Sequence, residues 1–207
     1  MKVVCFFDAN NWYHTIKGDY KPSSIDVKKI CGLIADMNDM DVLEIRWYVS
    51  MPNRKEDELM YKKQRSFLGH LQKQGIKIIS RKLQIITSKN IRKKREKIVS
   101  EWKLCDNCRK VVEENFLNVK DGKKEKGIDV WIAIDMVRIS MREDVDGCVL
   151  FSGDADFIPA LSLVESIGKR ILSVCVRNGY SNELRQKFPY YVLKKEDLDK
   201  CLKDYKK

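Results

Sequence analysis

The stretch KVVCFFDANN, residues 2–11, decides the fold, because a short apolar run there ends directly in polar side chains. Lys2 to Phe7 has the length and the continuous apolar character of a strand that is buried on both faces. Further strands, rich in β-branched, aromatic and other apolar residues, are indicated at residues 42–49, 76–79, 148–151 and 170–176. Strands that alternate with helices predict a parallel sheet with right-handed crossovers. We therefore expect an α/β protein, a Rossmann-like three-layer α/β/α sandwich with a mainly parallel central sheet.

The helices between these strands are indicated by apolar residues at helical spacing and by capping residues. Ser23 and Ser24 offer an N-cap to a helix that begins near Ile25. Gly75 is expected to end a long helix that begins near Arg54. The remaining expected elements are helices at 129–141, 157–167 and 195–203, a short helix opened by residue 181, and a short strand at 191–193.

Residues 81–126 interrupt this alternation and carry much of the charge. They contain 15 Lys and Arg against 7 Asp and Glu, in a chain whose net charge is +11. Leu83–Thr87 is compatible with a strand, but Lys89–Lys97 is a charge run. Irregular segments of this length are usually functional or disordered. We expect a single domain spanning residues 1–207 with a basic, only partly ordered insertion at about 81–126.

Composition excludes several classes of protein. No window approaches 18 consecutive apolar residues, so we expect no membrane span. The N-terminus lacks the apolar core and the cleavage site of a signal peptide, and it begins a strand instead. The seven cysteines are then expected to be reduced thiols in the cytoplasm. A locally concentrated positive charge favours a polyanionic partner.

Carboxylates follow two of the predicted strands. Asp8 ends the first strand, Asp154 and Asp156 follow the fourth, and Asp129 begins a helix. Each of them alone could be a helix N-cap. Ligands of open parallel sheets bind beyond the carboxyl ends of the strands, so we expect Asp8 and Asp154 to lie close together. The same argument supports the convergence of Asp129 and Asp156 with them less strongly. Because converging carboxylates repel one another, the pattern indicates a bound cation, and all-oxygen ligands favour Mg²⁺ or Mn²⁺.

Other sites of α/β proteins lack support in the sequence. No glycine-rich turn follows the first strand, and no Walker A motif is present, so dinucleotide and P-loop sites are disfavoured. Asn10 stands where a haloacid-dehalogenase phosphatase would need a second aspartate. His14 and His70 are the only histidines, which gives little support to a histidine-based triad.

Three motifs in order resemble the NYN domain family, the LabA-like branch of the PIN-like nucleases. They are FFDANNWYH at 6–14, KGIDVWIAIDM at 126–136 and VLFSGDADFIPAL at 149–161. The resemblance implies a PIN-like fold and a metal-dependent ribonuclease. By position it makes Asp8, Asp129, Asp154 and Asp156 the catalytic, metal-binding carboxylates, and Asn11, Lys126 and Ser152 the residues that contact the substrate. Asp135 also matches an acidic position of the family, but it lies six residues after Asp129 and points away from it.

Cys105 and Cys108 resemble half of the zinc ribbon that some LabA-like proteins carry. A complete ribbon needs four ligands, and no second Cys-x-x-Cys or nearby histidine follows in the sequence. We therefore do not expect a structural zinc within one chain. A zinc shared between two chains, a decayed zinc site, a redox-active pair and two ordinary reduced thiols are the alternatives.

The carboxylate pattern and the basic charge predict a Mg²⁺- or Mn²⁺-dependent nuclease, and the resemblance implies that its substrate is RNA. We expect endonucleolytic cleavage, with an exonuclease as the alternative. Lys93, Lys94 and Arg95 are expected to hold the RNA backbone through phosphate contacts. Trp12 and Tyr13 could stack on bases, but we expect them to pack in the core. A catalytically silent RNA-binding module and a small-molecule phosphohydrolase are the alternatives. The resemblance also suggests a homodimer.

Overall fold

The structure, a computed structural model, describes residues 1–55, 57–82, 84–86, 88–118, 122–124, 127–177 and 179–203. The chain divides into two compact units. The first, here called the core unit, comprises Met1–Arg81 and Gly127–Lys207. The second, the basic unit, comprises Lys82–Lys126 and is described separately.

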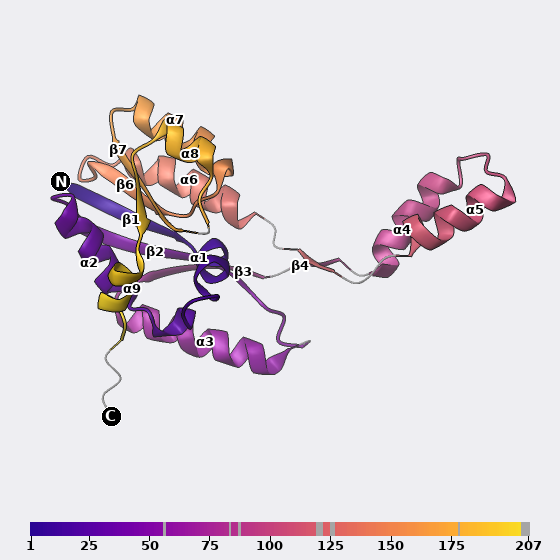
Figure 1. The fold of residues 1–207 in the computed structure, drawn as a ribbon, viewed down its shortest axis with the longest axis horizontal. Coiled ribbons are helices and arrows are strands. Elements are labelled where there is room, and N and C mark those ends of the chain that lie inside the picture. Colours follow the sequence, from indigo (N-terminus) through magenta and orange to yellow (C-terminus); the bar gives the residue numbers. More distant parts are fainter. Residues whose placement is uncertain are drawn as a thin grey trace. The chain divides into compact units, whose positions relative to one another are not determined.

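A six-stranded, all-parallel sheet in the order β3-β2-β1-β6-β7-β8 forms the centre of the core unit (Figure 1). Its central strand β1 is buried from Val3 to Asp8, as the apolar run predicts. In the register of the sheet, Asp8 lies opposite Tyr48 of β2, and Phe7 lies opposite Phe151 of β6. The strands are β1 Lys2–Asp8, β2 Asp41–Met51, β3 Lys77–Lys82, β6 Gly147–Phe151, β7 Arg170–Val176 and β8 Tyr190–Leu193.

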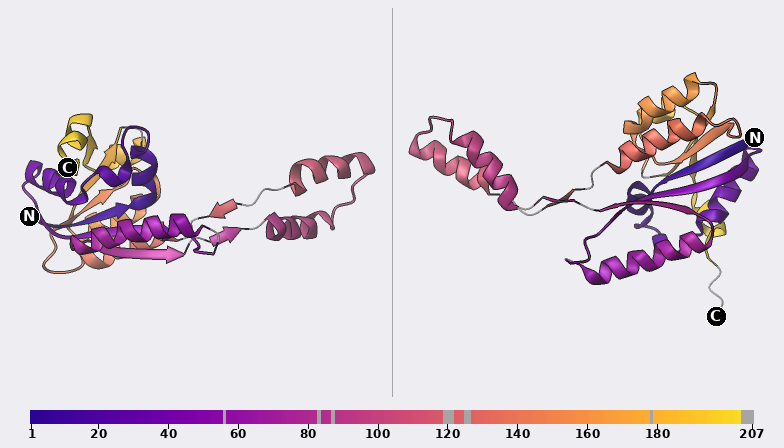
Figure 2. Two further views of the ribbon diagram at one scale, coloured as in Figure 1. Left: turned by 90° about the horizontal axis from the view of Figure 1, so that it is seen from below. Right: turned by 180° about the vertical axis from the view of Figure 1, so that it is seen from behind.

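Helices cover both faces of this sheet, which confirms the three-layer sandwich (Figures 1 and 2). One face carries α1 Ala9–Ile16, α2 Val27–Met37, α3 Glu58–Lys73 and α9 Lys195–Lys200. The other carries α6 Ile128–Ser140, α7 Ile158–Ser166 and α8 Asn182–Lys187. Within the described ranges, no helix has both the length and the apolar character that crossing a membrane would require.

Two helix starts differ from the prediction, and in both cases an aspartate is the cap. Residues 22–24 form the short 3₁₀ helix η1, and Asp26 caps α2 by accepting hydrogen bonds from the backbone N–H groups of Lys28 and Lys29. Asp57 caps α3 by accepting from the N–H of Met60, so this helix begins later than Arg54. An aspartate carboxylate satisfies such N–H groups as well as a serine hydroxyl does, so either residue could be the cap.

The described residues of the basic unit form helices and a hairpin, and its expected partial order stays a prediction. Its elements are β4 Gln84–Ile86, α4 Ser88–Val99, α5 Asp106–Val112, the π-helix η2 Glu113–Leu117 and β5 Gly122–Lys124, which pairs antiparallel with β4. Arg95 donates a hydrogen bond to the carbonyl oxygen of Phe116, and its guanidinium lies 4.6 Å from the ring centroid of that residue. Trp102 stacks on the same ring at 6.1 Å. These contacts hold α4 against η2.

The seven cysteines are free thiols. Cys5, Cys31, Cys148, Cys175 and Cys201 are buried and pack as small apolar side chains. Burial raises the pKa of Cys148 to about 12 and that of Cys175 to about 11, so both stay protonated at neutral pH. Cys105 and Cys108 are exposed and belong to the basic unit.

Candidate active site

Asp8 stands where β1 ends and α1 begins. It is buried, with 4% of its surface exposed. One carboxylate oxygen, Oδ1, accepts hydrogen bonds from the backbone N–H groups of Asn10 and Asn11, both at 3.1 Å, so Asp8 is the N-cap of α1. The other, Oδ2, accepts a hydrogen bond from the hydroxyl of Ser152 at 3.2 Å. Asp8 therefore joins the end of β1 to the turn that follows β6.

The turn after β6 brings Asp154 to the same place. The Ser152 hydroxyl, which donates to Asp8, accepts the backbone N–H of Asp154 at 3.3 Å. The N–H of Gly153 points to the side-chain oxygen of Asn11 at 3.4 Å. Together, Asp8, Asn11, Ser152, Gly153 and Asp154 form what we call the β1–β6 corner. The Ser152 hydroxyl thus links the Asp8 carboxylate to the backbone of Asp154, at the carboxyl ends of two neighbouring strands.

Gly153 is required by a close approach of two backbone segments. A Cβ atom at this position would lie 1.5 Å from the carbonyl oxygen of Gly179, in the segment that follows β7. The carbonyl oxygen of Gly153 in turn accepts the N–H of Ser181 at 2.8 Å. The segment after β7 is therefore fixed against the β1–β6 corner.

We expect Gly153→Ala to destabilise the protein by about 3 kcal/mol, the upper end of the usual cost of overpacking, because the obstacle is backbone and cannot rotate away. Chemical denaturation of the purified variant measures this change. Gly32→Ala is the matched control: Gly32 lies inside α2 with nothing within 4 Å of the added Cβ, so the substitution should stabilise the protein by about 0.5–1 kcal/mol. A Gly153→Ala variant as stable as wild type would contradict the close approach.

Asp129 and Asp156 lie near the same edge of the sheet but are not part of the corner. Asp156 donates its backbone N–H to Asp154 at 3.0 Å, while its side chain is exposed. Asp129 is exposed in the first turn of α6. The start of this helix lies at the carboxyl end of β3, since a Cβ on Gly127 would be 2.8 Å from the guanidinium of Arg81. Their role as metal ligands stays a prediction.

The donor atoms of the corner suit a hard cation. Asp8, Asn11 and Asp154 offer oxygen atoms, which Mg²⁺ and Mn²⁺ prefer. Within the described part of the chain, no three His, Cys, Asp or Glu side chains are close enough to share one ion. Mg²⁺ is commonly held by one or two carboxylates, with water and substrate phosphate completing its shell. The pair Asp8 and Asp154 fits that mode of binding.

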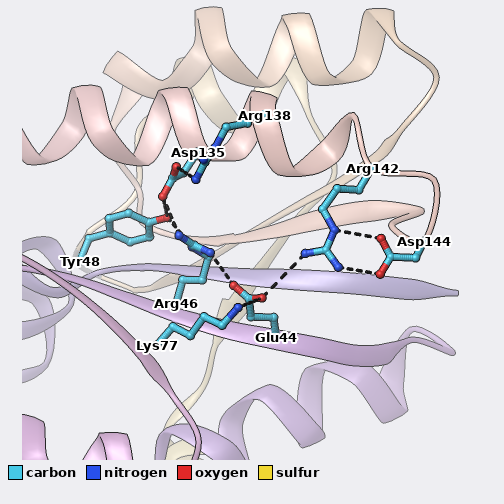
Figure 3. Close-up of polar contacts among 8 residues, drawn as sticks. All are labelled: Glu44, Arg46, Tyr48, Lys77, Asp135, Arg138, Arg142 and Asp144. Atoms are coloured by element: carbon cyan, nitrogen blue, oxygen red, sulfur yellow. Dashed lines mark hydrogen bonds and ion pairs between the residues drawn. The ribbon is translucent and has the colours of Figure 1, made fainter.

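Asp135, the further acid that matches the family, belongs to a buried ionic network on the α6 face of the sheet (Figure 3). One of its carboxylate oxygens accepts hydrogen bonds from Arg46 and from the hydroxyl of Tyr48, both at 2.8 Å. The other accepts from Arg138 at 2.9 Å. Arg46 continues the network to Glu44 at 2.6 Å. These hydrogen bonds engage both oxygens of a buried carboxylate with side chains of β2 and α6, so we assign it a structural role.

The ionisation states in this network follow from burial and from its hydrogen bonds. Burial, together with the hydrogen bond to Asp135, raises the pKa of Tyr48 well above its ordinary value, so Tyr48 remains a donor. Burial also opposes ionisation of Glu44, but hydrogen bonds from Lys77 and Arg46 outweigh it and lower the pKa of this carboxyl. Glu44 is therefore charged at neutral pH and balances Arg46.

The aromatic residues after Asp8 have different positions. Trp12 is buried and packs edge-on against Phe7, with ring centroids 5.4 Å apart, which confirms core packing for this residue. Tyr13 is 49% exposed and contacts the side chains of His14 and Lys17. The expectation of core packing is wrong for Tyr13, because its side of α1 faces solvent.

The basic candidates also differ from one another. Lys93 and Lys94 are exposed on α4, so their charges are accessible to a polyanion. Arg95 is only partly exposed, and its contacts with Phe116 stabilise the basic unit. Lys126 lies outside the described residues.

The Cys-x-x-Cys pair lies at the start of α5. Cys105 is the N-cap, and the nearby backbone N–H and then the thiol of Cys108 lower the pKa of Cys105. Among the residues described, no third metal-binding side chain completes a site with the two thiols. Whether they hold zinc with another chain stays a prediction.

An aromatic group that was not among the predicted site residues lies beside the corner. Tyr180 follows β7, and its Cα would be 2.6 Å from a Cβ placed on Gly153. Its ring contacts the guanidinium of Arg185, which also contacts the ring of Tyr190. Its position could have indicated a role in binding, because ligands of parallel sheets bind beyond the carboxyl ends of the strands and Tyr180 closely follows one of them.

Comparison with known proteins agrees with this architecture. The sequence model of the NYN domain matches residues 2–194. Among solved structures, a crystal structure of a protein of unknown function from Vibrio parahaemolyticus RIMD 2210633 is similar, with a TM-score of 0.60. The match covers 95% of this chain and 94% of that chain at 20% sequence identity, a level at which the likeness shows the fold alone. No curated protein sequence matches the chain.

Proposed function

Because the chain belongs to the NYN domain family, which has a PIN-like nuclease fold, we propose that it is a metal-dependent ribonuclease acting at the β1–β6 corner. The observation that supports this most is the hydrogen-bonded chain from Asp8 through Ser152 to Asp154. It joins the Asp8 carboxylate to the backbone of Asp154 beyond the carboxyl ends of adjacent strands, and α/β proteins bind their ligands at such positions. The reaction is the hydrolysis of an RNA phosphodiester.

Asp8 and Asp154 would hold Mg²⁺ or Mn²⁺, with Asp129 and Asp156 as further candidate ligands. When bound, such an ion lowers the pKa of a water molecule and neutralises charge on the phosphate. The Ser152 hydroxyl orients the Asp8 carboxylate by its hydrogen bond to Oδ2. Asn11 keeps its amide N–H₂ available for a phosphate oxygen while its carbonyl oxygen faces the N–H of Gly153. Lys126 is a further candidate for a phosphate contact.

A catalytically silent RNA-binding module is the second candidate. It is favoured by one observation: within the described ranges, the corner contributes fewer than three clustered metal-binding side chains. Nucleases that use two ions need more ligands than one such pair supplies. The same fold supports both activities, so the chemistry of the site has to decide between them.

Cleavage of a labelled single-stranded RNA tests the proposal. Purified protein should cleave it with Mn²⁺ or Mg²⁺ and should be inactive in EDTA. A circular RNA included as substrate should also be cut, since endonucleolytic attack needs no free end. RNA binding without cleavage under every metal condition would favour the silent module. Hydrolysis of a small phosphate ester but not of RNA would instead indicate a phosphohydrolase.

We expect the double variant Lys93→Gln, Lys94→Gln to bind RNA more weakly and with a weaker dependence on salt. Removing one lysine–phosphate interaction should reduce the slope of log K against log [salt] by about 0.7 for a single strand, so removing two should reduce it by about 1.4. Fluorescence anisotropy at several salt concentrations measures this slope. The variant Lys28→Gln, Lys73→Gln removes two exposed charges from the core unit and is the matched control. An unchanged slope in the first variant would place the RNA elsewhere.

A further inference from the structure

Tyr180, Arg185 and Tyr190 form a cationic, aromatic platform on the core unit. The guanidinium carbon of Arg185 lies 4.4 Å from the ring centroids of both tyrosines. Arg185 also donates a hydrogen bond to the hydroxyl of Tyr190 at 2.8 Å. The two tyrosines remain 39% and 41% exposed, so each keeps surface available to a ligand. We call these three residues the Tyr–Arg–Tyr platform.

The platform is fixed beside the β1–β6 corner. Tyr180 immediately precedes Ser181, whose N–H donates to the carbonyl oxygen of Gly153 at 2.8 Å. Gly153 lies between Ser152 and Asp154, so the backbone of Tyr180 adjoins the residues that would bind the scissile phosphate. Ser181 also caps α8, the helix that carries Arg185. The position of the platform therefore follows from the same close approach that requires Gly153.

The chemistry of the platform suits the face of a nucleobase. Nε of Arg185 is buried without a hydrogen-bond partner among the described residues, so this guanidinium is held mainly by its contacts with the two rings and the Tyr190 hydroxyl. Aromatic rings and arginine planes are the groups on which proteins stack unpaired bases. Stacking reads the π-face of a base and tolerates every sequence. A base in a duplex is already stacked on its neighbours and offers no free face.

We infer that the Tyr–Arg–Tyr platform binds an unpaired base of single-stranded RNA next to the phosphodiester at the β1–β6 corner. This inference rests on the proposed ribonuclease function and adds its substrate class, a single strand with little sequence preference. Tyr180 contributes its ring, Arg185 orients that ring, and Tyr190 holds Arg185. Tyr180 is a substrate-binding residue here, and Arg185 is a positioning residue.

Binding in EDTA, where the metal-dependent cleavage is absent, tests the platform separately from catalysis. Tyr180→Leu should bind single-stranded RNA roughly 5- to 150-fold more weakly than wild type, the effect of removing the stacking of one base. Tyr180→Phe keeps the ring and should bind as wild type does. A fluorescent base analogue, 2-aminopurine, should be quenched on binding by wild type and Tyr180→Phe and much less by Tyr180→Leu. With Mn²⁺, Tyr180→Leu should raise KM and leave kcat nearly unchanged.

The outcomes separate the two proposals. Cleavage by wild type, combined with equal RNA binding by Tyr180→Leu and wild type, would overturn the platform and leave the nuclease. RNA binding that depends on the Tyr180 ring, without cleavage under any metal condition, would overturn the nuclease and support the platform. Failure of wild type to bind single-stranded RNA in EDTA would overturn the platform. An equal loss of binding in Tyr180→Phe and Tyr180→Leu would also overturn it, because the phenyl ring retains the stacking face.

Discussion

Asp154→Asn should lower the rate of RNA cleavage by at least about 100-fold while leaving the fold intact. Partners that only orient a metal ligand already change activity by about 10–100-fold when they are mutated, so loss of a ligand's charge should cost no less. The fold should survive because, among the described residues, the Asp154 carboxylate accepts one hydrogen bond, from the N–H of Asp156 in the short helix η3, Ala155–Phe157. An asparagine oxygen can accept the same bond. The cleavage rate in Mn²⁺ and the thermal unfolding midpoint measure the two effects.

Asp36→Asn is the control for this variant. Asp36 is exposed on α2, so its substitution removes the same charge from the surface without touching the corner. It should cleave RNA as fast as wild type. Cleavage by Asp154→Asn at the wild-type rate would show that the site lies elsewhere. A large fall in its unfolding midpoint would show that Asp154 is structural.

Asp135→Ala should destabilise the protein by about 3–5 kcal/mol, which is a large part of the stability of an ordinary domain. The side chain of Asp135 is 7% exposed and that of Arg46 is 12% exposed. Removing the acid would leave the Arg46 guanidinium and the Tyr48 hydroxyl buried with fewer hydrogen-bond partners. A buried charge without its partner strongly lowers the free energy of unfolding. Denaturant titration at neutral pH measures the change.

Asp144→Ala gives the comparison within the same region of the structure (Figure 3). Asp144 is paired with Arg142 at 2.6 Å, but its side chain is 54% exposed. Exposed pairs contribute at most about 1 kcal/mol, so this variant should be nearly as stable as wild type. Equal effects of the two substitutions would contradict the structural role of Asp135. A folded Asp135→Ala protein that had lost all activity at full stability would instead assign Asp135 to the site.

The alternation of apolar runs and helical patterns was sufficient to predict the sheet of the core unit and most of its helices, but not α1. Strand β7 has the predicted bounds, and β1 differs only by including Asp8. Helix starts were less predictable, because serine and aspartate are similar caps and the sequence places Ser24 and Asp26 two residues apart. Helices α4 and α5 of the basic unit were not predicted, because their packing involves contacts between distant residues, such as Arg95 with Phe116, that no local pattern reveals.

The candidate site was predictable only where topology determines position. Asp8 and Asp154 lie at the ends of adjacent parallel strands, so the strand order brings them together. Asp129 and Asp156 lie on helices, whose rotation and tilt depend on packing and cannot be read from spacing. The contacts of Tyr180 with Arg185 depend on the close approach of Gly153 to Gly179, which only the three-dimensional structure shows.

The most direct test of the proposed active site is the rate of RNA cleavage by Asp8→Asn beside wild type, purified identically and assayed in Mn²⁺ with an EDTA control. An asparagine at position 8 can still cap α1 by accepting the N–H groups of Asn10 and Asn11, so the variant should fold. We predict metal-dependent cleavage by wild type and its loss in Asp8→Asn, with RNA binding in EDTA retained. Cleavage by Asp8→Asn at the wild-type rate would contradict the assignment of the β1–β6 corner as the active site.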